Sequence, residues 1–126
     1  MAKVLVVEDN PANLKLATFL LQSAGHTVIT ARDAESGLAL AREDQPDLVL
    51  MDIQLPGMDG LRATALLKSE DATRDIPVIA LTALAMKGDE ERIRAAGCDG
   101  YIAKPMAYRE FLATIAARLA KAPLYG

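Results

Sequence analysis

The side chains in this sequence that could carry chemistry stand at the ends of short apolar runs. They are Glu8 and Asp9 after residues 4–7, Asp52 after residues 48–51, Thr82 after residues 78–81, and Lys104 after residues 101–103. If these runs are parallel strands, their carboxyl ends meet at one edge of the sheet, where such sheets bind ligands. Each residue alone has an ordinary explanation, such as a turn aspartate or a solvated lysine. Their placement at successive strand ends favours a working site.

The three acids indicate a divalent cation. Carboxylates that converge repel one another, and the usual remedies are a raised pKa or a bound metal. The candidate site offers neither thiolate nor imidazole, because Cys98 is expected in the core and His26 on the surface. Oxygen ligands alone favour Mg²⁺, which proteins commonly share between carboxylates and a phosphoryl oxygen.

The same residues predict phosphoryl chemistry. A hydroxyl donor at Thr82 and a compact ammonium at Lys104 can neutralise phosphoryl oxygens. Asp52, the most central acid, is the natural nucleophile for forming an acyl phosphate. Phosphoryl transfer requires mainly alignment and charge stabilisation, which these few groups can supply.

Apolar runs alternate with helical patterns along the chain. Strands are predicted at residues 4–7, 26–31, 48–51, 78–81 and 101–103, and helices at 13–24, 33–42, after Asp59, at 86–96 and at 107–121. This alternation predicts a flavodoxin-like α/β fold, a doubly wound, five-stranded parallel sheet in the order 2-1-3-4-5 with helices on both faces. The three most apolar runs should be central and the other two should be edges. Residues 2–121 form the predicted domain, and residues 122–126 a loose tail.

Three of the predicted helices differ in their apolar faces. The helix after Asp59 carries Leu61, Ala65 and Leu66. The last helix has the stripe Tyr108, Phe111, Leu112, Ile115 and Leu119. The helix over residues 86–96 is charged, with Glu90 and Arg94 spaced to pair across one turn. Its small apolar surface predicts a mobile element.

Length and composition exclude several classes of protein. A chain of 126 residues and 13.5 kDa fits one domain, and a hydrophobic content of 52% argues against disorder. The net charge of -3, with no clustered basic face, argues against a nucleic-acid surface. The sequence has no signal-peptide pattern and no apolar run long enough to span a membrane. The protein is therefore expected in the cytoplasm.

The ordered set of motifs resembles a known family. Glu8-Asp9, Asp52 within residues 51–60, Thr82-Ala83 and Lys104-Pro105 are similar to the motifs of the CheY-like receiver domain of two-component response regulators. The likeness covers residues 3 to about 121. Residues 85–94 and the absence of an output domain make the chain similar to single-domain regulators in particular. Cell-cycle or cell-division control is the pathway that this likeness implies.

The resemblance implies a role for each residue. Asp52 would accept a phosphoryl group from a phosphohistidine on a sensor histidine kinase or a histidine phosphotransferase, and phosphorylation would alter binding to a downstream protein. Mg²⁺ would be held by Asp9, Asp52, the backbone carbonyl of Gln54 and, through water, Glu8. The phosphoryl oxygens would be bound by Thr82 and Lys104, with Ala83 leaving room for them.

The resemblance also implies a switch and a docking surface. Tyr101 would be the aromatic switch that turns inward as Thr82 moves toward the phosphoryl group. A kinase helix would dock near Asn10, Pro11, Asn13 and Leu14. Such a domain assists its own phosphorylation and dephosphorylation and is not an enzyme in the usual sense.

Three alternatives stay open. An aspartyl-phosphate hydrolase uses a similar sheet with Mg²⁺, but it needs a second acid two residues after the nucleophile, where this sequence has Gln54. An inert docking domain with the same fold would not need the intact acidic set. The chain could also be a receiver from a hybrid kinase, although Met1 and the short tail favour a whole protein.

Overall fold

The structure, a computed structural model, describes residues 2–83, 87–104 and 107–121. The strands are β1 (Lys3–Val7), β2 (Thr27–Ala31), β3 (Leu48–Asp52), β4 (Val78–Thr82) and β5 (Gly100–Ala103). The helices are α1 (Pro11–Ser23), α2 (Ala34–Asp44), α3 (Gly60–Ser69), α4 (Lys87–Ala95) and α5 (Tyr108–Lys121). Pro105 of the predicted Lys-Pro motif, Met86 at the start of the predicted helix 86–96, and the predicted tail 122–126 lie outside the described residues.

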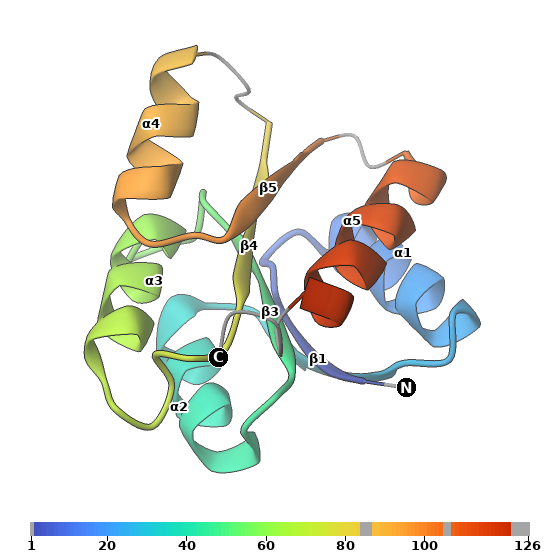
Figure 1. The fold of residues 1–126 in the computed structure, drawn as a ribbon, viewed down its shortest axis with the longest axis horizontal. Helices are drawn as coiled ribbons and strands as arrows, with labels where there is room; N and C mark the ends of the chain where they lie inside the picture. The colour runs from blue at the N-terminus through green and yellow to red at the C-terminus, as the bar shows by residue number, and fades with distance from the viewer. Residues whose placement is uncertain (1, 84–86, 105–106, 122–126) are drawn as a thin grey trace.

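The described strands form one parallel sheet in the order β2-β1-β3-β4-β5. This order confirms the predicted doubly wound fold, with the three most apolar strands at the centre. Figure 1 shows α1 and α5 on one face of the sheet and α2, α3 and α4 on the other. The carboxyl ends of all the strands share one edge, and β1 and β3 lie side by side there, with Val7 in register with Met51.

Two apolar clusters hold these layers together. Every residue of β3 and of β4 is buried. On one face, the sheet packs against Leu21 of α1 and against Phe111 and Ile115 of α5. On the other face, it packs against Leu38 of α2 and Leu67 of α3. Burial on both faces explains why the central strands read as continuous apolar runs in the sequence.

Polar side chains fix where the first three helices begin. The Asn10 side chain accepts hydrogen bonds from the backbone N–H groups of Ala12 and Asn13. Asp33 and Asp59 cap α2 and α3 in the same way. Because these caps directly follow strands or their loops, they also set the path of the chain at the carboxyl edge of the sheet.

The predicted inner face of α3 is partly wrong. Ala65 is exposed, whereas Ala63, Thr64 and Leu67 are buried. The Thr64 hydroxyl donates a hydrogen bond to the Gly60 carbonyl at 2.9 Å. Because this bond satisfies the hydroxyl, a polar residue can occupy the inner face of the helix.

The predicted stripe of α5 is wrong at Tyr108. Phe111 and Ile115 are fully buried, but Tyr108 is 55% exposed. Tyr108 is the first residue of the helix, and the stripe reaches the core one turn later, at Phe111. The tyrosine instead borders a surface groove together with Phe19 of α1.

Helix α4 has little apolar surface against the sheet. Of its described side chains, Ile93 alone is buried. The predicted pairing of Glu90 with Arg94 is not among the ion pairs of the described residues, and Asp89 pairs with Arg92 at 3.3 Å instead. The Glu90 carboxylate accepts a hydrogen bond from the Tyr101 hydroxyl on β5.

A polar network closes the amino-terminal edge of the sheet. The Lys68 ammonium lies 2.9 Å from a carboxylate oxygen of Asp99 and donates to the Ile76 carbonyl at 2.9 Å. The same Asp99 oxygen accepts from the backbone N–H of Val78 at 2.8 Å. The Arg118 guanidinium donates to the Asp99 carbonyl at 2.6 Å. The residue before β5 thus joins α3, the start of β4 and α5.

His26 and Cys98 both lie near this amino-terminal edge, because each precedes a strand. His26 is half-buried, not on the surface as predicted, and its Nδ1 accepts from the backbone N–H of Ala2 at 3.2 Å. Cys98 is only partly buried, against the cluster that includes Leu67. Within the described ranges, no helix has the length and apolar character needed to cross a membrane.

Candidate functional site

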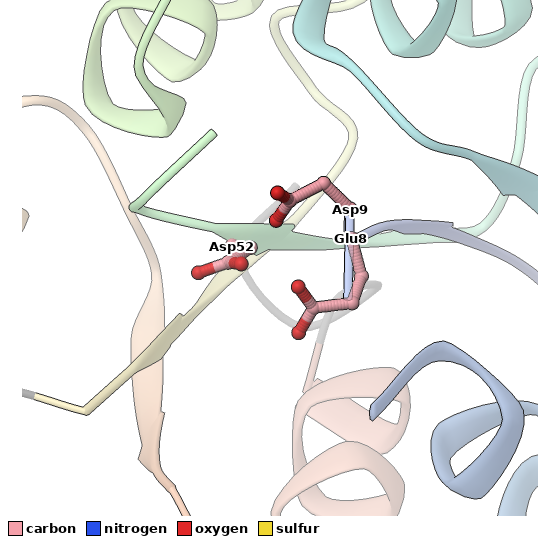
Figure 2. A group of neighbouring side chains, drawn as sticks. All are labelled: Glu8, Asp9 and Asp52. Carbon is pink, nitrogen blue, oxygen red and sulfur yellow. The ribbon is translucent and has the colours of Figure 1, made fainter. Parts of the chain in front are cut away.

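Three carboxylates meet at the carboxyl edge of the sheet. Glu8 and Asp9 directly follow β1, and Asp52 is the last residue of β3. Because β1 and β3 are neighbours, the three side chains converge, and one oxygen from each lies within 4.8 Å of the others (Figure 2). Glu8 and Asp52 are buried, whereas Asp9 is half-buried. Hard oxygen donors at this spacing fit Mg²⁺.

The Lys104 ammonium lies between two of these carboxylates. Its Nζ is 2.7 Å from Glu8 Oε1 and 3.1 Å from Asp52 Oδ2. The lysine reaches this position from the end of β5, where its backbone N–H donates to the Thr82 carbonyl at 2.7 Å. Its side chain is 15% exposed, so the ion pairs are largely shielded from water. Among the side chains that the structure describes, one ammonium thus pairs with two of the three clustered acids.

The excess of carboxylates over positive charge shifts the pKa values of the groups in this cluster. Burial and the neighbouring Glu8 carboxylate raise the pKa of Asp52 to about 7. Burial alone would raise the pKa of Glu8, but hydrogen bonds with Asp52 and Lys104 lower it below the ordinary value. Burial opposes the charged form of Lys104, but its bond with Glu8 and the attraction of Asp52 raise its pKa. Near neutral pH, Asp52 therefore lies close to releasing its proton, and a bound cation would favour that release.

The loop after β3 is shaped to present Asp52. The backbone N–H of Gln54 donates to Asp52 Oδ1 at 3.1 Å, which orients the carboxylate. The N–H of Gly60 donates to the Ile53 carbonyl at 2.9 Å. A Cβ at Gly60 would lie 2.0 Å from the Asp52 carbonyl oxygen, so the close approach of α3 to β3 requires glycine. This role of Gly60 is not predicted from the sequence, although the turn-forming Asp59-Gly60 pair is its signal.

The loop after β1 is held by two contacts that the sequence does not reveal. The Arg32 guanidinium donates to the Asp9 carbonyl at 3.3 Å. The backbone N–H of Asn10 donates to Glu8 Oε2 at 3.3 Å. Glu8 Oε2 therefore bonds its own loop while Oε1 faces Lys104. Arg32 is distant in sequence from Asp9, so no local pattern predicts the first contact.

The other predicted site residues lie around this cluster. Thr82 ends β4, is buried, and borders a cavity of about 210 Å³ together with Gln54. Ala83 and Gln54 are exposed. Tyr101 lies on the edge strand β5 and is 37% exposed, with its hydroxyl bonded to Glu90. The structure therefore gathers Glu8, Asp9, Asp52 and Lys104 into one cluster, places Thr82 at a neighbouring strand end, and directs the Tyr101 hydroxyl toward α4.

Comparison with known families identifies this arrangement. The family model of the response regulator receiver domain matches residues 4–116. The chain belongs to the response regulator receiver family. This confirms the resemblance seen in the motifs and places the receiver domain in two-component signalling.

Individual relatives support the same conclusion. The receiver domain is 52% identical over 119 residues to the polar-differentiation response regulator DivK of Brucella anthropi, covering 94% of this chain and 97% of that protein. DivK of Brucella abortus is 51% identical over the same shares of the two chains. The predicted similarity to single-domain regulators is thus confirmed by the match to DivK.

Solved structures show the same receiver fold. The receiver domain of the Pseudomonas aeruginosa sensor histidine kinase PA1611 matches with a TM-score of 0.88 and 34% identity, covering 94% of this chain and 98% of that one. That protein has a magnesium ion coordinated in its active-site cleft. A CheY-like receiver domain protein of Methanospirillum hungatei matches with a TM-score of 0.91 and 28% identity, covering 100% of this chain and 99% of that one.

Proposed function

We propose that this receiver domain accepts a phosphoryl group from a phosphohistidine onto Asp52, and that the modification changes which proteins it binds. The observation that carries this proposal is the cluster of three carboxylates around Lys104 at the carboxyl edge of the sheet. Asp52 is the central acid of the cluster, at the end of a fully buried strand. A rigid strand end suits a nucleophile, because phosphoryl transfer depends chiefly on alignment.

In the proposed step, a carboxylate oxygen of Asp52 attacks phosphorus while the bond from phosphorus to the histidine nitrogen breaks. The electron pair of that bond stays on the imidazole, which takes a proton from solvent, and Asp52 becomes an acyl phosphate. The attack requires deprotonated Asp52, whose pKa of about 7 keeps the loss of the proton accessible near neutral pH. Lys104, 3.1 Å from Asp52 Oδ2, would neutralise charge on the transferred group.

Asp9 and Asp52 would hold Mg²⁺ directly, together with the backbone carbonyl of Gln54, and Glu8 would hold it through water. When bound, the ion would supply positive charge that offsets the repulsion between the carboxylates and an incoming phosphoryl group. The carboxylate oxygens within 4.8 Å of one another support this donor set. The magnesium ion in the cleft of the Pseudomonas receiver supports it further.

Thr82 and Ala83 would respond to the phosphoryl group. The Thr82 hydroxyl would bind a phosphoryl oxygen, and the small side chain of Ala83 would leave room for it. The cavity of about 210 Å³ beside Thr82 gives this region space to rearrange. Tyr101 would then turn inward, so that phosphorylation changes the surface formed by β5 and α4.

The phosphodonor would be a sensor histidine kinase or a histidine phosphotransferase that docks beside the site, on α1. Asn10 and Pro11 begin this helix next to Asp9. Further along the same helix, Leu16 is 40% exposed and Phe19 is 65% exposed, so both side chains would be accessible to a docking partner. The domain would act in the cytoplasm, and its likeness to polar-differentiation regulators supports a role in cell polarity and division.

Labelling with a small phosphodonor tests this function. With Mg²⁺ and radiolabelled acetyl phosphate, the protein should gain one acid-labile and base-labile phosphate, and Asp52→Asn should gain none. Asp75→Asn, an exposed acid outside the cluster, is the matched control and should label like the wild type. Labelling that persists in Asp52→Asn would refute the assignment. Turnover of p-nitrophenyl phosphate would instead favour the hydrolase, for which Gln54 is the wrong residue.

A further inference from the structure

The Tyr101 side chain is fixed on one side by a hydrogen bond and borders open space on another. Its hydroxyl donates to the Glu90 carboxylate on the facing helix α4. Its ring borders a cavity of about 380 Å³, which Ile93 and Arg94 also line. Such a cavity could hold several waters at about 30 Å³ each, so packing does not lock the ring. The position of the ring therefore depends on the bond to Glu90.

The same bond connects α4 to the sheet. Helix α4 lies against β5 (Figure 1), and Ile93 is the single buried side chain among those described in the helix. The ion pair of Asp89 with Arg92 lies within the helix and does not attach it to the sheet. Glu90, by contrast, reaches across to a strand. A helix with so few attachments should respond measurably to the loss of one of them.

Glu90 also has a second potential partner. Arg94 lies one turn further along α4, at the spacing that allows a glutamate and an arginine to pair. In this structure the carboxylate bonds Tyr101 instead. The hydrogen bond to Glu90 raises the pKa of the Tyr101 hydroxyl, and the positive charge of Arg94 lowers it. The bond to Glu90 is the stronger influence. The carboxylate can thus exchange one partner for the other without leaving the helix surface.

We propose that Glu90 is the positioning residue for Tyr101: its carboxylate holds the ring outward and couples α4 to β5, and it passes to Arg94 when the ring turns inward. This inference rests on the proposed function for the inward turn alone. The contact between Glu90 and the outward Tyr101 belongs to the unphosphorylated domain, so it can be measured without any phosphodonor.

A tyrosine titration tests the contact directly. The bond to Glu90 raises the pKa of the Tyr101 hydroxyl above its ordinary value. In protein with labelled tyrosine ring carbons, NMR should show this pKa falling toward the ordinary value in Glu90→Gln. Glu91→Gln removes the same charge from the neighbouring exposed position and should leave the pKa unchanged. An unchanged Tyr101 pKa in Glu90→Gln, or equal falls in both variants, would overturn the proposal.

Hydrogen exchange tests the coupling of the helix to the strand. Backbone amides of α4 should exchange about fivefold faster in Glu90→Gln and in Tyr101→Phe, as expected for the loss of one hydrogen bond. The double variant should exchange no faster than either single variant, because both changes remove the same bond. Additive effects, or rates equal to those of the wild type and of Glu91→Gln, would contradict the coupling.

Phosphorylation separates this inference from the proposed function. After treatment with acetyl phosphate and Mg²⁺, the Tyr101 ring-carbon signals of the wild type, recorded at neutral pH where the acyl phosphate persists, should shift and coincide with those of phosphorylated Glu90→Gln, because the ring has left the carboxylate. A wild-type protein that labels on Asp52 but whose Tyr101 ring signals stay where they are in the unphosphorylated protein would refute the exchange and leave the proposed function intact. A protein that does not label would refute the proposed function, while the titration and the exchange rates would still decide the contact.

Discussion

Asp52→Asn should make the metal-free protein more stable, and more so at pH 8 than at pH 5. Burial and the Glu8 carboxylate raise the pKa of Asp52 from the ordinary value of 3.8 to about 7. The folded protein therefore holds this proton more tightly than the unfolded chain does. As the pH rises through that window, the free energy of unfolding of the wild type falls. Asparagine carries no charge at either pH, so the variant avoids this loss.

The expected magnitude follows from the size of the pKa change and from the shielding of the site. A rise from 3.8 to about 7 corresponds to about 4 kcal/mol, at ~1.4 kcal/mol for each tenfold change in proton affinity. Water reaches the cluster beside the half-buried Asp9, and the Lys104 ammonium lies 3.1 Å from Asp52, so we expect a gain of about 1–2 kcal/mol at pH 8. At pH 5 the gain should shrink to a few tenths of that value. Glu8 does not interfere, because its lowered pKa changes stability only below the ordinary value of 4.5.

Urea titrations followed by circular dichroism, in EDTA at both pH values, measure this difference. The exposed Asp75→Asn is the charge-matched control and should change the free energy of unfolding by less than about 0.5 kcal/mol. Added Mg²⁺ at pH 8 should stabilise the wild type more than Asp52→Asn and so narrow the gap. If Asp52→Asn instead destabilised the protein equally at pH 5 and pH 8, favourable contacts and not repulsion would dominate at Asp52, and the reasoning would be refuted.

Three further substitutions probe other parts of the site. Lys104→Met leaves Glu8 and Asp52 without their ammonium, so unfolding at pH 8 should become about 1–2 kcal/mol easier by urea titration, and acetyl phosphate labelling at least tenfold slower. Gly60→Ala places a Cβ 2.0 Å from the Asp52 carbonyl oxygen and should cost about 3 kcal/mol or more in the same titration, whereas Gly88→Ala, with nothing within 4 Å, should cost nothing. A Gly60→Ala protein as stable as the wild type would contradict the close approach. Asn10→Ala removes the cap of α1 and should lower stability by about 1 kcal/mol in thermal unfolding, and an unchanged melting temperature would show that the cap contributes nothing.

The meeting of Glu8, Asp9 and Asp52 could be predicted because it depends on strand order alone. Right-handed crossovers between parallel strands leave few arrangements, and each one allowed here puts the ends of the central strands at one edge. The contacts inside the cluster could not be predicted in the same way. Lys104 lies closer to Glu8 than to Asp52, at 2.7 Å against 3.1 Å, and this depends on how buried side chains pack.

Simple spacing rules failed where a polar side chain finds a partner that the rule does not consider. The spacing of Glu90 and Arg94 favours a pair along the helix, but the carboxylate bonds Tyr101 on the facing strand. Similarly, periodicity placed Ala65 on the inner face of α3, where the buried Thr64 satisfies its hydroxyl within the helix. In the first case the deciding partner lies on another element, so only the folded chain provides it. In the second, the partner is a backbone carbonyl one turn earlier in the same helix, which periodicity of apolar residues does not consider.

The network around Asp99 indicates that the two edges of this sheet have different roles. The carboxyl edge carries the chemistry, and the amino-terminal edge holds the fold together. At the amino-terminal edge, the Asp99 oxygens described above each accept from a donor. Substitution of Asp99 should therefore weaken the attachment of α3, β4 and α5 together. At the carboxyl edge, repulsion between the crowded acids lowers the free energy of unfolding, and neutralising one acid should raise it. An engineer could therefore rewrite the loops that follow the strands to alter signalling while the scaffold stays anchored from the far side.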